Sequence, residues 1–130
     1  EALENVGLLS AIHKMPAELS VGMRKRIGLA RAIILKPEII FYDEPSSGLD
    51  PIMTGKIDEL IIHTQKTLQV TSVVVTHDMA SACRIADRIA MIYDGSLIAV
   101  DTVENFKQIK DERVQAFFHS LRTVKEEQRI

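Results

Sequence analysis

Two short apolar runs separated by a helical pattern set the strongest limit on how this chain can fold. Glu38–Tyr42 and Thr71–Thr76 have the length and the β-branched or aromatic content of strands. Both runs are apolar without alternation, which is typical of strands covered on both faces. Between them, Pro51–Leu68 repeats apolar residues at helical spacing. Strand, helix and strand in this order predict an α/β fold with a mostly parallel sheet and flanking helices.

Further helices are expected before and between these strands. Ala2–Ile12 reads as one short helix, and Ser20 is a good N-cap for a helix from Val21 to about Leu35. Asp50 is an N-cap followed by a proline at the first helical position. The residues expected on one face of the helix after Ser20 are Met23, Ile27, Ala30 and Ile34.

The last third of the chain predicts a hairpin between short helices. The expected elements are a helix over Met79–Ala86, strands over Arg88–Tyr93 and Ser96–Val100, and helices over Val103–Ile109 and Glu112–Lys125. Asp94-Gly95 is a typical two-residue hairpin turn. On the last helix the apolar residues on one side are Val114, Phe117, Phe118 and Leu121. Such a stripe is more typical of a core, with a dimer or partner contact as the alternative.

Composition narrows the class of protein. With 130 residues and 46% hydrophobic content, the chain has the size of one domain, or of part of a larger one, and enough apolar residues for a packed core. A net charge of −2 gives no case for binding nucleic acid or an anionic membrane surface. No apolar run approaches the roughly 18 residues of a membrane span. The acidic N-terminus is not a secretory signal, and Cys83 stands alone, which suits a reducing compartment.

Ionisable residues come directly after each of the two expected strands. Asp43 and Glu44 come directly after the first strand, and His77 follows the second. In open parallel sheets ligands bind beyond the carboxyl ends of the strands. There one carboxylate can hold hydrated Mg²⁺, its neighbour can polarise a water, and a histidine can contact a terminal phosphate. Taken singly, each residue favours a simpler alternative, in which the carboxylates cap a loop and His77 is an ordinary surface residue.

Taken together, these segments resemble the ATP-binding-cassette (ABC) ATPase family over almost the whole chain. The matching segments are Leu19–Met23 (LSVGM), similar to the signature loop, Ile39–Glu44, similar to the Walker B strand, Ser47–Asp50, similar to the D-loop, and His77, similar to the switch histidine. The resemblance implies a P-loop NTPase-like fold. It divides the chain into the end of a helical subdomain (1–35), part of the ATPase core (36–100) and C-terminal helices (101–130).

The resemblance also implies cofactors and residue roles. The cofactors are ATP and Mg²⁺. Asp43 would support Mg²⁺, Glu44 would position or activate the attacking water, and His77 would contact the γ-phosphate. The residues implied in nucleotide binding are Ser20, Val21, Gly22 and Asp50. The first three would act on ATP that is held by a second ATPase protomer, where the helix N-terminus after Ser20 favours an anion. The turn after Glu44 would deliver Asp50 to the same dimer interface, where it would help to complete that site.

A closer resemblance points to transport. The context MPAELSVGM and the stretch 111–118 (DERVQAFF) are similar to the ATPases of phospholipid-trafficking, Mla-type importers. This similarity implies integral-membrane permease subunits and a second ATPase protomer as partners. It places the protein on the cytoplasmic face of the inner or plasma membrane, as a peripheral subunit that powers transport by hydrolysing ATP.

Two departures from the family pattern leave a second hypothesis open. Val21 stands where the signature loop has its first glycine, and glycine usually allows the backbone to approach a phosphate. No G-x-x-x-x-G-K-[ST] phosphate-binding loop occurs in these 130 residues, so the chain looks like the C-terminal half of an ATPase domain. The alternative is therefore a truncated or degenerate cassette that serves as a non-catalytic dimerisation or regulatory module.

The remaining conspicuous basic and histidine residues receive simpler interpretations. Arg24, Lys25 and Arg26 place three cations near a helix N-terminus, and a solvated basic face is expected for at least two of them. The isolated histidines lack metal-ligand spacing and are expected to be surface or structural residues; they are His13, His63 and His119.

Overall fold

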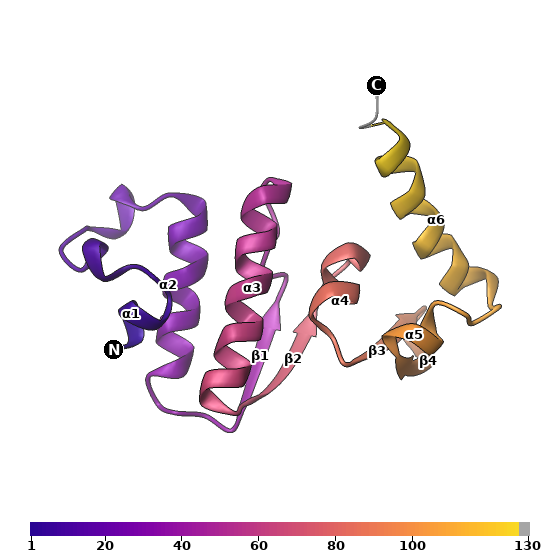
Figure 1. The fold of residues 1–130 in the computed structure, drawn as a ribbon, viewed down its shortest axis with the longest axis horizontal. Coiled ribbons are helices and arrows are strands. Elements are labelled where there is room, and N and C mark those ends of the chain that lie inside the picture. Colours follow the sequence, from indigo (N-terminus) through magenta and orange to yellow (C-terminus); the bar gives the residue numbers. More distant parts are fainter. Residues whose placement is uncertain (128–130) are drawn as a thin grey trace. The chain divides into compact units, whose positions relative to one another are not determined.

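A computed structural model describes the backbone of residues 1–127 and the side chains of residues 1–119. The chain forms two compact units, Glu1–His77 and the part from Asp78 onward. Both are drawn in Figure 1, and each is described here by itself.

The first unit contains the parallel strand pair that the sequence predicts. Its elements in order are α1 (Ala2–Asn5), η1 (Leu9–Ala11), η2 (Pro16–Glu18), α2 (Val21–Ile33), β1 (Ile39–Asp43), α3 (Pro51–Leu68) and β2 (Thr71–Val75). Strands β1 and β2 are parallel, with Ile39 opposite Thr71 and Asp43 opposite Val75. Helix α3 makes the connection between them and packs on β2 (Figure 1). The predicted strand–helix–strand order is confirmed.

The expected single helix over Ala2–Ile12 is wrong. Helix α1 ends at Asn5, and the chain turns at Gly7, whose φ is 65°, a left-handed conformation that glycine adopts without strain. Val6, Leu8 and Ala11 are nevertheless buried. The apolar spacing that suggested one helix is therefore satisfied by two short turns on either side of Gly7.

Both predicted helix caps in the first unit are present. The Ser20 hydroxyl accepts from the Met23 N–H at 3.2 Å, and Asp50 Oδ1 accepts from Ile52 N–H at 2.9 Å and from Met53 N–H at 3.0 Å. The N-terminal donors of a helix have no partner inside the helix, so these bonds fix where α2 and α3 begin.

The buried face of α2 differs from the expected one. The residues that are buried are Gly22, Leu29, Ala30 and Ile33, whereas Ile34 is exposed. Both stripes have helical spacing, so periodicity alone does not choose between them. A Cβ on Gly22 would lie 2.8 Å from Met53 Cε, so the close approach of α3 selects the face that carries this glycine.

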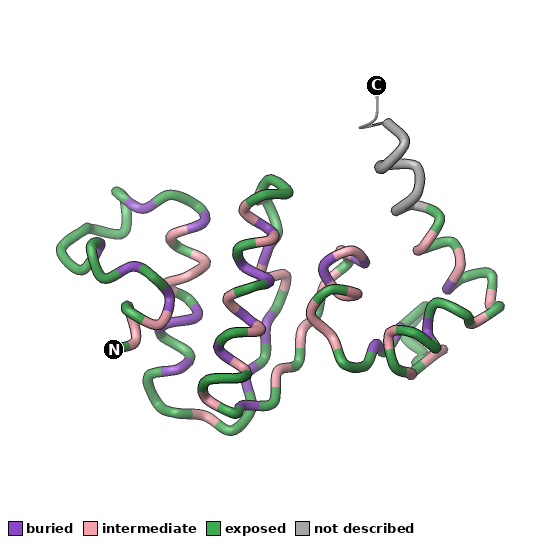
Figure 2. Tube along the Cα trace, viewed as in Figure 1, coloured by how far each residue is buried: buried purple, intermediate pink, exposed green. Residues whose placement is uncertain are grey.

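Strand β1 is covered on one face only within the described residues. Ile40 and Tyr42 are buried, but Ile39 is exposed and Phe41 is 76% exposed, an alternation that can be followed along β1 in Figure 2. Strand β2 alternates in the same way between exposed and half-buried residues. The expectation that both strands are covered on both faces is therefore wrong for this part of the chain.

The second unit is built around a hairpin. Its elements are α4 (Met79–Ile85), β3 (Arg88–Tyr93), β4 (Ser96–Thr102), α5 (Val103–Phe106) and α6 (Glu112–Glu127). Strands β3 and β4 are antiparallel, and the turn residues Asp94 and Gly95 have φ values of 46° and 71°. Positive φ at both positions is what a type I′ turn requires, so the predicted hairpin and its turn are confirmed.

The core of the second unit joins the hairpin to its helices. Its buried residues are Met79, Ile89, Met91, Phe106 and Val114. Phe118 packs edge to face on Phe106, with ring centroids 6.1 Å apart, while Phe117 is 38% exposed. The predicted core role holds for Phe118, and Leu121 lies outside the described side chains. Cys83 packs beside this core, and burial raises the pKa of its thiol.

The start of α6 is fixed by one acidic side chain. Asp111 Oδ1 accepts from the Arg113 N–H at 2.9 Å, and its other oxygen accepts from the Arg113 guanidinium at 2.6 Å. These bonds lower the pKa of Asp111 to about 2. The guanidinium also lies 5.6 Å from the centre of the Tyr93 ring, so it connects α6 to β3.

Candidate functional site

The parallel register of β1 and β2 brings the predicted site residues to one sheet edge. Asp43 is the last residue of β1 and lies opposite Val75, the last residue of β2. The Glu44 N–H continues the ladder by donating to the Val75 carbonyl at 2.9 Å. His77 follows two residues after Val75, so Glu44 and His77 leave the sheet side by side.

Glu44 and His77 are in direct contact through one carboxylate oxygen. Glu44 Oε1 lies 3.1 Å from the backbone N of His77 and 2.9 Å from its ring Nδ1. Nδ1 donates to a carboxylate only when it carries the proton, so this contact selects the tautomer. The His77 side chain is 80% exposed and that of Glu44 is 33% exposed. The pair is therefore an oriented carboxylate that solvent can reach, as a base acting on water requires.

The backbone of Glu44 is also held by hydrogen bonds. Its φ is 45°, a left-handed conformation that is uncommon for residues other than glycine. The Glu44 carbonyl accepts from the Ser47 N–H at 3.2 Å and from Lys25 Nζ at 2.9 Å. Lys25 Nζ also donates to the Ser47 hydroxyl at 3.0 Å. Side chain and backbone contacts together determine where the carboxylate points.

Sequence reasoning missed Lys25. A solvated basic face was expected for at least two of the three cations near the start of α2, but only Arg24 is exposed, whereas Lys25 and Arg26 are half-buried. Arg24 donates to the Leu19 carbonyl, and Lys25 bridges Glu44 and Ser47. Both acceptors of Lys25 lie about twenty residues further along the chain. No pattern among neighbouring residues in the sequence predicts that contact. It arises because α2 packs beside the end of β1.

The loop Leu19–Met23 lies beside the start of α3. Gly22 is buried against Met53, and the Asp50 carboxylate caps the same end of α3. Ser20 caps α2, and Val21 is 44% exposed. The structure therefore gives Ser20, Gly22 and Asp50 local roles in the fold, and it places Gly22 close to the helix that Asp50 begins.

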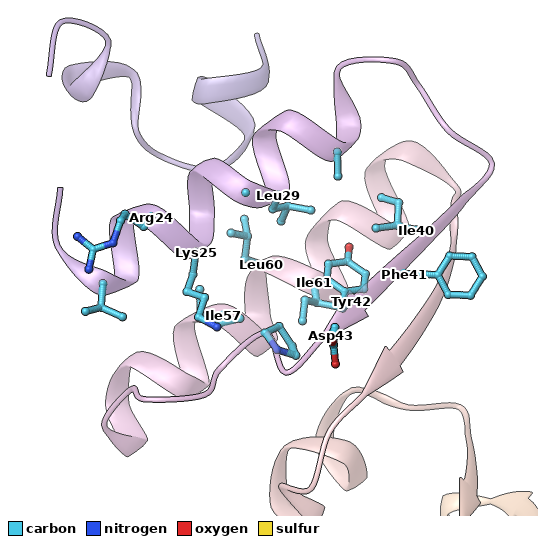
Figure 3. A pocket seen from close by; sticks show the side chains of 14 residues that line it. Arg24, Lys25, Leu29, Ile40, Phe41, Tyr42, Asp43, Ile57, Leu60 and Ile61 are labelled. Carbon is cyan, nitrogen blue, oxygen red and sulfur yellow. The ribbon is translucent and has the colours of Figure 1, made fainter. Parts of the chain in front are cut away.

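A cavity of about 330 Å³ lies between α2, β1 and α3. Figure 3 shows its wall of apolar side chains, including Leu29, Ile40 and Ile61, with Lys25 and Asp43 among the polar ones. Tyr42 also lines this cavity, and burial raises the pKa of its hydroxyl.

The site offers one exposed carboxylate as a metal ligand. Within the described residues there is no group of three or more His, Cys, Asp and Glu side chains that could hold a metal ion. Mg²⁺ is usually held by only one or two carboxylates, together with waters and the phosphates of a substrate. Asp43 is exposed at the end of β1 and fits this type of site as a single protein ligand.

Among the helices in the part of the chain that the structure describes, none combines the length and the apolar content that crossing a bilayer requires.

Comparison with known proteins connects this geometry to a family. A family model described as ABC transporter matches residues 1–47. The chain is 47% identical over 115 residues to the intermembrane phospholipid transport system ATP-binding protein MlaF of Haemophilus influenzae, covering 88% of the chain and 44% of that protein. It is 38% identical over 122 residues to a probable amino-acid ABC transporter ATP-binding protein of Sinorhizobium fredii, covering 93% of the chain and 48% of that protein.

A solved structure gives the same result. The fold matches the ATP-binding cassette MJ0796, solved as a dimer in a post-hydrolysis state bound to ADP and Pi, with a TM-score of 0.67 and 31% identity. The match covers 78% of this chain and 44% of the cassette. The chain thus spans a little under half the length of these two curated relatives.

Proposed function

The chain belongs to the family of ABC transporter ATP-binding proteins, and from this premise we propose that it forms part of a subunit that hydrolyses ATP to drive transport. The observation that carries the proposal is the contact between Glu44 and His77 beside the exposed Asp43. A base, the group that orients it and a metal-binding carboxylate meet at the edge where parallel sheets bind ligands.

Each of these residues has a role in the proposed reaction. Asp43 would be the protein ligand of Mg²⁺, which when bound would offset the negative charge of the phosphates. Glu44 accepts a hydrogen bond from the attacking water and takes its proton as the water oxygen bonds to the γ-phosphorus. The bond from that phosphorus to the β–γ bridging oxygen breaks, and ADP and phosphate leave. His77 holds the Glu44 carboxylate in place and reaches the terminal phosphate from the neighbouring strand end.

A second protomer completes the proposed site. The residues that would act on nucleotide bound to that protomer are Ser20, Val21, Gly22 and Asp50. The dimeric state of the related cassette supports this arrangement. Val21 places a branched, exposed side chain in the loop, so the approach to phosphate is narrower than with glycine.

The transported substrate is proposed from the relatives. The identity is 47% over 115 residues to one intermembrane phospholipid transport ATPase and 41% to another, against 45% over 93 residues to a phosphate import ATPase and 38% to the amino-acid and betaine transport ATPases. We therefore propose phospholipid transport, with integral-membrane permease subunits as partners on the cytoplasmic face of the membrane.

The proposal is tested by comparing the chain with a cassette that joins this sequence to a phosphate-binding loop. The cassette is expected to release phosphate from Mg-ATP, whereas isothermal titration of the 130-residue chain should detect no binding. The loop's N–H groups and lysine normally hold the β- and γ-phosphates, and residues 1–130 contain no such loop. Micromolar binding by the chain alone would contradict this account. A correctly folded cassette that binds ATP without turnover would favour the non-catalytic module.

Replacing His77 by alanine is expected to lower turnover of this cassette by about 10- to 100-fold, the typical loss of a hydrogen bond to a charged group. Its melting temperature should change little, because the side chain is 80% exposed. Phosphate release and thermal unfolding measure the two effects. His63→Ala, at an exposed histidine on α3, is the matched control. Normal turnover in His77→Ala, or a large fall in melting temperature, would indicate a structural role instead.

A further inference from the structure

Lys25 joins two segments that the proposed reaction uses separately. It lies in the second turn of α2, two residues after the loop Leu19–Met23. Its ammonium reaches the Glu44 carbonyl at 2.9 Å and the Ser47 hydroxyl at 3.0 Å, and Figure 3 shows the side chain leaving α2 on the side of the cavity. Both acceptors belong to the turn from Glu44 to Ser47. Lys25 therefore holds two points of this turn and not a single residue.

The turn that Lys25 contacts needs such support. Glu44 has a left-handed backbone, which is energetically unfavourable for a residue that is not glycine. Gly48, four residues on, has a φ of 76°. Three hydrogen bonds hold the Glu44 backbone in this conformation. Its N–H donates to the Val75 carbonyl, and its carbonyl accepts from the Ser47 N–H and from the Lys25 ammonium. The bond from Lys25 is charge-assisted, and such bonds are stronger than those between neutral groups.

We infer that Lys25 is a positioning residue that holds the Glu44–Ser47 turn against α2. It thereby keeps the loop Leu19–Met23 and the Glu44 carboxylate in one fixed arrangement. The role in hydrolysis rests on the proposed function, in which Glu44 serves the nucleotide of its own protomer and the loop Leu19–Met23 serves that of the other. Closure of one site would then be transmitted through Lys25 to the base of the other.

Hydrogen exchange of the 130-residue chain tests the physical connection without any nucleotide. Exchange is followed at two backbone amides that are hydrogen-bonded to Glu44. The Ser47 N–H donates to the Glu44 carbonyl, and the His77 N–H donates to Glu44 Oε1. In Lys25→Met, which keeps an unbranched side chain but removes the donors, both should exchange about tenfold faster. Lys25→Arg, which retains donors, should restore most of the protection. Lys56→Met, at an exposed position on α3, is the matched control.

The outcomes separate this inference from the proposed function. Unchanged exchange at Ser47 and His77 in folded Lys25→Met overturns the inference, as does an equal acceleration at α3 amides such as Ile61, which would mean a general loss of stability. If Lys25→Met does not fold, Ser47→Ala decides, because it removes one of the two acceptors and should speed His77 exchange about threefold. No change there would also overturn it.

The catalytic part is measured in the cassette that carries a phosphate-binding loop. Lys25→Met should lower kcat about tenfold with little change in KM, because Lys25 contacts the Glu44 turn and not the phosphate cradle. Normal kcat together with faster exchange would refute the role in hydrolysis while leaving the structural connection intact. Absence of turnover in the parent cassette would refute the proposed function instead, and the exchange result would still decide the connection.

Discussion

Glu44→Gln is expected to lower ATP turnover by about 10²- to 10⁴-fold, the usual contribution of a positioned general base, in a cassette that joins this sequence to a phosphate-binding loop. The amide has almost the same shape as the carboxylate, and its oxygen can still accept from the His77 N–H that lies 3.1 Å from Oε1. What the substitution removes is the capacity to take a proton from water. Nucleotide binding should remain, so ATP-bound dimers are expected to accumulate.

Two measurements check this expectation. Steady-state phosphate release gives the loss of turnover, and size-exclusion chromatography with Mg-ATP shows whether dimers accumulate. Glu59→Gln is the matched control, because Glu59 is an exposed residue of α3 in the same unit. Phosphate release by Glu44→Gln at the rate of the parent would exclude Glu44 as the base, whatever its contact with His77.

Phe106→Ala is expected to lower the free energy of unfolding of the second unit by about 3–5 kcal/mol, the typical cost of removing a buried aromatic ring. Phe106 is 0% exposed and stands among Met79, Ile89, Met91 and Val114. Its ring also supports Phe118 edge to face. The hairpin and its helices enclose this one side chain, so the cavity it leaves cannot close without moving several of them.

Urea unfolding followed through the amide signals of β3 and β4 measures this loss directly. Phe117→Ala is the control on the neighbouring surface, because Phe117 is 38% exposed, and it should cost less than about 1–2 kcal/mol. A similar small cost for Phe106→Ala would show that the core reorganises around the missing ring.

Features set by neighbouring residues could be predicted from the sequence. Ser20 and Asp50 cap the helices that follow them, and Asp94-Gly95 makes the hairpin turn, because each needs only its own side chain and the next few backbone groups. The meeting of Glu44 and His77 was also predictable. Parallel strands end at the same sheet edge, so residues that follow two paired strands must lie close together.

Features set by distant packing could not be predicted. The apolar spacing before Ser20 did not show the turn at Gly7, since two short turns bury the same residues as one helix. The contact from Lys25 to the Glu44 carbonyl needs α2 to lie beside the end of β1, which no local pattern records. Phe41 looked like a buried strand residue, yet exposure depends on what covers the strand and not on the strand itself.

At Glu44 the residue that best suits the left-handed backbone differs from the residue that the proposed reaction requires. Glycine would adopt a φ of 45° without the penalty that a longer residue incurs, so a chain selected only for a stable fold would favour glycine over glutamate there. The substitution Glu44→Gly would relax the turn and delete the carboxylate together. Stabilising changes chosen from backbone statistics would therefore target this position early, and they would yield a better-folded protein with the proposed chemistry removed.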